Sequence, residues 1–373
     1  MDDRSMFHAM DRAKHSMELK RTNTAQSRGI DAPPAPPVGG EPPLVTEEAE
    51  GPGLVSNEQQ AAVTAWGVGT ILAGDRPYYG AIHKTVLLQT DTGRYVLRGY
   101  RHRDRAPVER EHAVIAHVCQ HGVPAIAPLP LRSGDTILDL QDRRYALFPS
   151  APGRQFRKGE LGMAEARAMG AILAQVHQAL RSLPERWATR RSFAVDHANT
   201  IARLDMLEAV IRGRTDGDPV HSSALARLMV QRRWITALSP AAAVDFAGLD
   251  QQVLHGDFQE TNLFFADGQV SAVIDWDQTH IAPRGWEVVR TLHYTFGFAP
   301  ALCRSFLAAY RRALPLSARD LDQTAAAYDV KVRHDLWAYE AFYLEGNTRV
   351  GRFLLPPPSP SVAERWAALH RQL

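Results

Sequence analysis

The stretch HGDFQETN (residues 255–262), followed by IDWD (residues 274–277), places two carboxylates and a carboxamide close together among apolar neighbours. Between the two motifs, short apolar runs flank Asp267-Gly268, a residue pair typical of a tight hairpin turn. The sequence therefore predicts a β-hairpin whose open end carries both motifs.

This hairpin would bring Asn262 and Asp275 to nearly opposite positions at its open end, with Asp257 on the loop that enters its first strand. Carboxylate and amide oxygens bind hard cations, and Mg²⁺ commonly takes only one or two protein ligands beside substrate phosphates. We therefore predict that Asn262 and Asp275 hold Mg²⁺ and that Asp257 accepts a proton from a hydroxyl group. This division of roles is that of phosphoryl transfer. The alternative is that Asp and Asn cluster here only because they favour turns.

Two further residues of the motifs are expected to have supporting roles. His255 is expected to orient the loop through hydrogen bonds rather than to take part in the chemistry. Asp277 is expected to pair with a nearby arginine, although it could also bind the metal.

Taken together, the two motifs resemble those of the superfamily of aminoglycoside phosphotransferases, choline kinases and homoserine kinases. The resemblance extends from about Asn57 to the C-terminus and is strongest between Val253 and Trp286. It implies an α+β, two-lobed fold similar to that of the protein kinases, with a small β-rich N-lobe and a larger helical C-lobe. It also implies ATP as the phosphate donor, and it gives the same roles to the proposed base and metal ligands.

The fold that this resemblance implies needs a cation on the third strand of the small lobe and a Glu on the helix that follows. The strand Arg94–Tyr100 carries Arg98 where a kinase usually has Lys. The helix Pro107–Gln120 places Glu111 within an apolar stripe, where a carboxylate without a partner would be costly to bury. We therefore expect Arg98 to pair with Glu111 and to reach the ATP phosphates, with Lys84 as the alternative cation.

The same resemblance implies where the rest of the nucleotide would lie. Adenine is expected against the backbone from Phe148 to Ala151, so that Phe148 and Ser150 are predicted nucleotide-binding residues. A phosphate-covering loop is expected near Gly74 to His83, although it lacks GxGxxG. Glu287 stands where relatives often have Asp, which puts its supporting role in doubt.

Composition excludes several classes of function. The 373 residues are 45% hydrophobic and 23% charged, with a formal net charge of +2, which does not suggest a nucleic-acid or membrane partner. Cys119 and Cys303 form neither a disulfide framework nor a zinc motif, and no apolar run approaches the ~20 residues of a membrane span. We therefore expect a cytoplasmic protein.

The chain is expected to have three regions. Residues 1–54 are Pro-rich and read as a disordered tail, residues 55–150 as a nucleotide-binding N-lobe of strands and one helix, and residues 151–373 as the catalytic and acceptor-binding C-lobe. In the C-lobe, apolar periodicity predicts helices over 163–180, 196–212 and 222–238.

The acceptor is constrained mainly by charge. A pocket for polycationic aminoglycosides should be rich in carboxylates. From Arg290 onward, however, there are 11 basic and 7 acidic residues. This balance favours a small-molecule hydroxyl acceptor such as an amino-acid alcohol, a sugar or a natural product. A local acidic pocket remains an alternative, and it would be formed by Asp329, Asp335, Glu340 and Glu345.

Two other functions stay open at this point. The first is phosphorylation of Ser or Thr in a peptide, since kinase-like folds also accept peptides. The second is a nucleotide-binding pseudokinase scaffold, which is supported only by Arg98 and the glycine-poor loop.

Overall fold

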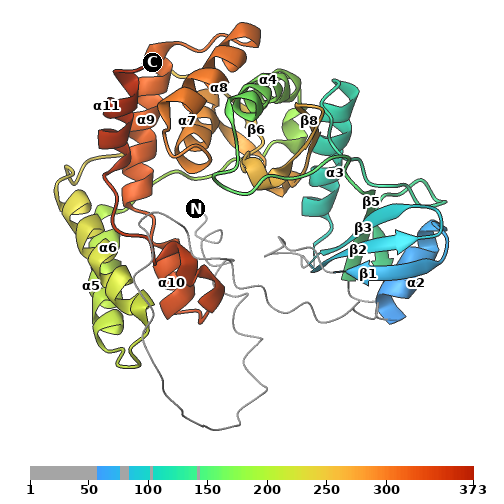
Figure 1. The fold of residues 1–373 in the computed structure, drawn as a ribbon, viewed down its shortest axis with the longest axis horizontal. Coiled ribbons are helices and arrows are strands. Elements are labelled where there is room, and N and C mark those ends of the chain that lie inside the picture. Colours follow the sequence, from blue (N-terminus) through green and yellow to red (C-terminus); the bar gives the residue numbers. More distant parts are fainter. Residues whose placement is uncertain (1–56, 76–83, 101–103, 141–142) are drawn as a thin grey trace, which may run out of the picture.

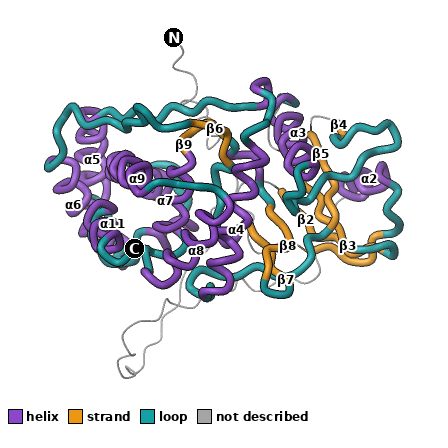
Figure 2. Tube along the Cα trace, turned by 90° about the horizontal axis from the view of Figure 1, so that it is seen from above, coloured by secondary structure: helices purple, strands orange, loops and turns teal. Residues whose placement is uncertain are grey.

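The computed structural model describes residues 57–75, 84–100, 104–140 and 143–373. Its N-terminal part is built on an antiparallel sheet of five strands, and the remainder is mainly helical; the two parts lie side by side in Figures 1 and 2. The expected α+β fold with a β-rich N-lobe and a helical C-lobe is confirmed. In sheet order, the strands are β1 (Ile71–Asp75), β2 (Lys84–Thr90), β3 (Arg94–Tyr100), β5 (Arg143–Pro149) and β4 (Leu138–Leu140).

The centre of the N-lobe sheet is the predicted hairpin of β2 and β3, which pair in antiparallel register. Its apolar face packs against α2 (Asn57–Trp66), a helix that the sequence analysis missed when it expected only one helix in this lobe. In residues 60–66, the part of this helix whose side chains the structure describes, only Ala62 and Val63 are fully buried. The apolar periodicity of the segment NEQQAAVTAW is therefore too weak to predict a helix.

The second N-lobe helix, α3 (Ala106–Gln120), lies at the boundary between the lobes (Figure 1). It begins with Pro107 in its first turn, as predicted, and its apolar residues join the main core of the C-lobe. Glu111 is buried on the same helix. The helix thus carries a buried carboxylate at the boundary between the lobes (Figure 1).

The C-lobe is organised around α4 (Met163–Leu180), whose predicted and observed limits agree, and which packs along α8 (Pro300–Ala313). The helix predicted over 196–212 begins one residue later, because Asp196 caps it, and the one predicted over 222–238 spans 219–236, because Asp218 caps it earlier. The other C-lobe helices are α5 (His197–Arg212), α6 (Pro219–Thr236), α7 (Arg284–Tyr294), α9 (Ala318–Arg333), α10 (Trp337–Tyr343) and α11 (Val362–His370).

The predicted hairpin at the motifs is present as β7 (Leu263–Ala266) and β8 (Gln269–Val273). Its turn residues Asp267 and Gly268 have φ values of 50° and 74°, as a tight two-residue turn requires. The Ile274 N–H donates to the Asn262 carbonyl at 3.0 Å, so the open end is closed by a hydrogen bond between the two motifs.

A second strand pair, which the sequence did not reveal, supports the loop before this hairpin. The strands β6 (Gln251–Leu254) and β9 (His280–Pro283) pair in antiparallel register. They hold the segment that precedes Asp257 against the segment that follows Asp275. Both ends of the motif region are thus fixed by strands.

Some expectations fall outside the described residues. These are the tail (1–54) and residues 76–83 of the phosphate-covering loop; the division of the chain at residue 150 also stays a prediction. Among the described residues, no helix is both long and apolar enough to cross a membrane.

The contact between α4 and α8 yields a stability prediction. Gly170 lies inside α4, and a Cβ atom there would collide with the backbone carbonyl of Phe306. Although Ala favours helices, Gly170→Ala should therefore lower the free energy of unfolding by about 1–3 kcal/mol. Gly213→Ala, where the nearest atoms would be 3.5 Å away, is the matched control and should be neutral or mildly stabilising. Urea unfolding of both variants measures this, and a stabilised Gly170→Ala protein would contradict it.

Candidate active site

The loop between β6 and the 3₁₀ turn Glu260–Asn262 carries the predicted base. Gly256 has a φ of 88°, and a Cβ atom there would collide with the Gln278 carbonyl, so this position needs glycine. His255 is fully buried; its Nε2 lies 3.0 Å from the Ile274 carbonyl, and its Nδ1 accepts the Asp257 N–H at 3.2 Å. These contacts orient the loop, which is the supporting role expected for His255.

Both carboxylate oxygens of Asp257 accept hydrogen bonds. Oδ2 accepts from Asn262 Nδ2 at 3.0 Å and from Gln259 Nε2 at 3.1 Å, while Oδ1 accepts from Arg290 Nη2. Asn262 Nδ2 also donates to the Asp257 carbonyl at 2.8 Å. Because its amide nitrogen is engaged in this way, Asn262 turns its amide oxygen away from Asp257, and this oxygen is the atom that could bind a metal.

Glu287, on α7, anchors the loop from behind. Its Oε1 accepts the Gly256 N–H at 2.6 Å, and its Oε2 accepts the His255 N–H at 3.1 Å. The carboxylate is only 1% exposed. Relatives often have Asp at this position, which put the supporting role of Glu287 in doubt. The longer Glu side chain still reaches two backbone donors of the loop, so its geometry fits that supporting role.

A buried relay continues from this carboxylate into the C-lobe core. His177 of α4 places Nε2 at 2.9 Å from Glu287 Oε2 and Nδ1 at 2.7 Å from the Tyr310 hydroxyl. Burial lowers the pKa of His177, which favours a neutral ring that donates to Glu287 and accepts from Tyr310. Burial alone would raise the pKa of Glu287, but the hydrogen bonds from His177 and from the Gly256 N–H lower it to about 2.

The ion pair predicted between the third strand and α3 is present. Arg98 Nη1 lies 2.8 Å from Glu111 Oε1, and its Nη2 lies 3.2 Å from Asp275 Oδ1 and 3.6 Å from Asp277 Oδ2. Burial raises the pKa of Glu111 to about 7, and the Arg98 guanidinium opposes this shift. Arg98 thus joins the N-lobe to the IDWD motif, and it is also the arginine expected to pair with Asp277.

The chemistry of Asp275 fits a cation site. This residue follows β8 with a φ of 67°, an uncommon conformation for a residue other than glycine. Burial and the nearby Asp277 carboxylate raise the pKa of Asp275, against the opposing charge of Arg98, so an added cation would be favourable here. The described residues contain no group of three His, Cys, Asp or Glu side chains placed to hold a metal. A metal held by Asn262 and Asp275 would therefore need phosphate oxygens as further ligands.

The predicted adenine contacts lie at the end of β5. Phe148 pairs with Val96 across the sheet, and the Ser150 N–H donates to the Arg94 carbonyl at 3.0 Å. Ser150 could therefore contact adenine through its carbonyl but not through this N–H. The alternative cation, Lys84, is placed only by its backbone, opposite Gly99 in β2.

Comparison with known proteins decides the family. The model of the family described as "Phosphotransferase enzyme family" matches residues 79–326. The chain belongs to this family. A homoserine kinase from Caulobacter sp. (strain K31) is 25% identical over 332 residues, covering 86% of this chain and 95% of the relative. The serine/threonine protein kinase RdoA of Salmonella typhimurium is 29% identical over 192 residues, which is 50% of this chain and 52% of that protein.

A solved structure shows the same fold. The aminoglycoside phosphotransferase from Alicyclobacillus acidocaldarius superposes with a TM-score of 0.59 at 15% identity, over 84% of this chain and 96% of its own. This likeness confirms the kinase-like two-lobed architecture, and the family match confirms the predicted resemblance and the predicted phosphotransferase activity.

The four carboxylates of the possible acidic acceptor pocket differ in their surroundings. Asp329 pairs with Arg333 at 2.6 Å, Glu340 bonds Arg203 at 2.6 Å, and Asp335 and Glu345 are exposed. Two of these carboxylates thus form ion pairs and two are exposed, as is expected of the charged face of an amphipathic helical segment.

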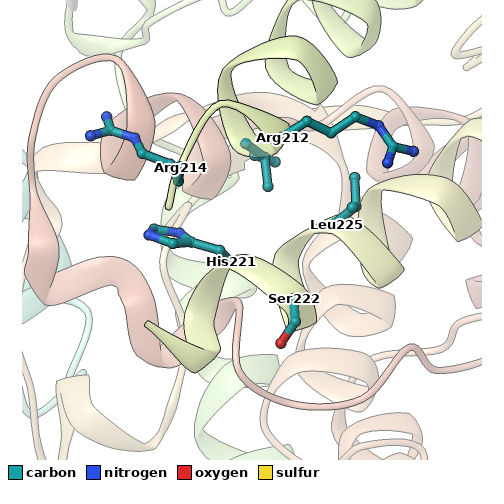
Figure 3. A pocket seen from close by; sticks show the side chains of 6 residues that line it. Arg212, Arg214, His221, Ser222 and Leu225 are labelled. Carbon is teal, nitrogen blue, oxygen red and sulfur yellow. The ribbon is translucent and has the colours of Figure 1, made fainter. Parts of the chain in front are cut away.

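A hollow of about 320 Å³ lies in the C-lobe between α5 and α6. Figure 3 shows that Arg212 and Arg214, on its rim, point in opposite directions. The hollow lies at the end of the C-lobe away from the N-lobe sheet (Figures 1 and 2). The two arginines on its rim therefore do not converge on a common point (Figure 3).

Sequence reasoning missed Arg290, His177 and Tyr310. Each lies on a helix with strong apolar periodicity. In such a helix, a single polar residue is usually assigned to the solvent-exposed face. Only the occurrence of His177 and Tyr310 inside apolar stretches signalled that they needed buried partners.

The buried Glu287 makes stability depend on pH. Because its pKa falls from an ordinary 4.5 to about 2 on folding, it contributes about 3 kcal/mol above pH 4.5, which is lost as the pH falls toward 2. Urea unfolding should show wild type more stable than Glu287→Gln at pH 7, and this difference should shrink by about 2 kcal/mol at pH 3. The exposed substitution Glu345→Gln is the control, and a difference independent of pH would contradict the assignment.

Proposed function

We propose that this phosphotransferase transfers the γ-phosphate of ATP, bound with Mg²⁺, to a hydroxyl group of a small molecule. The observation that carries the proposal is a set of contacts that joins the predicted site residues to one another. Asp257 is bonded to Asn262 at 3.0 Å, and Arg98 joins Asp275 at 3.2 Å to Glu111 at 2.8 Å. These contacts support roles for Asp257 as the base, for Asn262 and Asp275 as metal ligands and for Arg98 as the cation that binds phosphate.

In the proposed mechanism, Asp257 accepts the proton of the acceptor hydroxyl as this oxygen attacks phosphorus. Asn262 and Gln259 hold one carboxylate oxygen of the base, so the other is directed by Arg290 alone. Asn262, through its amide oxygen, and Asp275 would hold the metal ion, whose positive charge neutralises the phosphate oxygens when it is bound.

Arg98 positions the phosphates in this proposal. Glu111 in the N-lobe holds one nitrogen of the Arg98 guanidinium, and the other nitrogen contacts Asp275. A planar guanidinium can bridge a carboxylate and a phosphate, so it can take the part that a lysine plays in other kinases. The carbonyls near Phe148 and Ser150 would contact adenine.

The acceptor side of Asp257 carries an excess of positive charge. The Tyr294 ring is flanked by Arg290, with Cζ at 5.2 Å from the ring centre, and by Lys158, with Nζ at 4.9 Å. Burial raises the pKa of Tyr294, and the charges of Arg290 and Arg352 oppose this shift, which places a third cation nearby. Such a surface disfavours polycationic aminoglycosides and suits a small acceptor such as an amino-acid alcohol.

Two relatives bear on the choice of acceptor. The homoserine kinase, named for an amino-acid alcohol, matches over 95% of its length, whereas the serine/threonine kinase matches over 52%. The small-molecule acceptor is therefore favoured over a Ser or Thr side chain in a peptide.

Turnover tests this function directly. ADP release from Mg-ATP should depend on the acceptor, in a panel of amino-acid alcohols, sugars, aminoglycosides and Ser/Thr peptides. Asp257→Asn should lower the rate about 100- to 10,000-fold, because the base is removed while its shape is kept. Nucleotide binding without turnover on any acceptor would instead support the scaffold.

The metal ligands can be tested separately. Asp275→Asn should raise the Mg²⁺ concentration for half-maximal turnover about tenfold or more, since a metal ligand loses its charge. Asp267→Asn, at the hairpin turn where Asn also tolerates the left-handed backbone, is the matched control and should leave this concentration unchanged. Equal Mg²⁺ dependence of both variants would rule out Asp275 as a ligand.

A further inference from the structure

Arg290 is the residue of the site whose bonding is incomplete. Its Nη2 donates to Asp257 Oδ1, so the guanidinium lies beside the base. Its Nη1 is buried and has no hydrogen-bond partner in the described part of the chain. The side chain as a whole is 22% exposed, and it is therefore neither a surface arginine nor a fully paired core one.

A buried donor of this kind calls for a partner. Leaving a charged N–H group without an acceptor is more costly than leaving a neutral one, so native proteins rarely keep such groups unpaired. No carboxylate other than Asp257 pairs with Arg290 in the described residues. The missing partner is thus expected to be an acceptor atom outside the described residues, and a bound substrate can supply one.

The surroundings select the charge of that partner. Lys158 lies against the same Tyr294 ring as Arg290, and the charges of Arg352, Asp257 and Glu260 also act on the Tyr294 hydroxyl. Of these two carboxylates, Asp257 already pairs with Arg290. Three cations against two carboxylates leave a positive excess, which favours an anion at the open nitrogen.

We propose that Arg290 determines acceptor specificity by binding a carboxylate of the acceptor, so that the substrates are short hydroxy acids, including hydroxy amino acids. The inference rests on the proposed function and narrows its acceptor class. A guanidinium presents neighbouring nitrogens in a fixed plane, and one of them is committed to the base. The hydroxyl held by Asp257 and the carboxylate held by Nη1 must therefore be separated by only about two or three carbons, given hydrogen bonds of about 3 Å at each end.

Arg290 would then have two functions in one complex. It orients Oδ1 of Asp257 through its Nη2, and it fixes the acceptor through the acceptor's carboxylate, so that the hydroxyl is brought to the base. A neutral acceptor of the same shape would leave the Nη1 donor unpaired and would bind less well.

The test compares each acid with its amide. The acceptors are L-homoserine, 4-hydroxybutyrate and their amides, together with glycolate, 3-hydroxypropionate and 6-hydroxyhexanoate to vary the spacing. Binding to the enzyme saturated with a non-hydrolysable ATP analogue and Mg²⁺ is measured by calorimetry, and turnover with Mg-ATP is measured in parallel. The variants are Arg290→Gln, Arg290→Lys and the control Arg312→Gln, an exposed arginine of α8 that makes the same change in net charge.

Wild type and Arg312→Gln should bind the acids about 10- to 100-fold more tightly than the amides, with an optimum at two or three intervening carbons. This preference should disappear in Arg290→Gln and be partly kept in Arg290→Lys, which retains the charge. Equal binding of acids and amides by wild type, or a preference that survives in Arg290→Gln, would overturn the inference. Because binding is read without chemistry, an acid preference without turnover would support Arg290 as the anchor while contradicting the proposed function.

Discussion

The site depends on one buried carboxylate. Glu287 accepts hydrogen bonds from the His255 and Gly256 N–H groups at 3.1 and 2.6 Å and faces His177 Nε2 at 2.9 Å. A charge that is only 1% exposed is tolerable only while all of these partners are in place. Moving the loop would leave the charge unpaired, so the position of Asp257 is tied to the core of the C-lobe. Tyr310 extends this connection to a third helix.

A second constraint links the two lobes. Arg98 is surrounded by three carboxylates, Glu111 from the N-lobe and Asp275 and Asp277 from the C-lobe. One guanidinium cannot fully balance three carboxylates, so this cluster has a local deficit of positive charge. Magnesium would remove this deficit, and it would also release Arg98 from Asp275 toward the nucleotide phosphates. The same residues thus account for cohesion of the lobes in this structure and for the proposed binding of Mg-ATP.

Local interactions explain what the sequence could predict. Asp257, Asn262 and Asp275 converge because an Asp-Gly turn closes a hairpin between them, and Arg98 meets Glu111 because a carboxylate in an apolar stripe needs a partner. The adenine and metal roles remain predictions. The strand pair β6–β9 and the helix α2 were missed because short or weakly amphipathic segments carry little periodic signal. Arg290 and the His177 relay were missed because their partners come from segments distant in sequence, and only packing brings them together.

The most direct test of the account is a crystal structure of the enzyme with Mn²⁺ and a non-hydrolysable ATP analogue, with the metal located by anomalous scattering. The account predicts a peak between the Asn262 amide oxygen and the Asp275 carboxylate, with Arg98 bridging Glu111 and a phosphate. A metal bound elsewhere, or Arg98 still bonded to Asp275 with no phosphate contact, would contradict it.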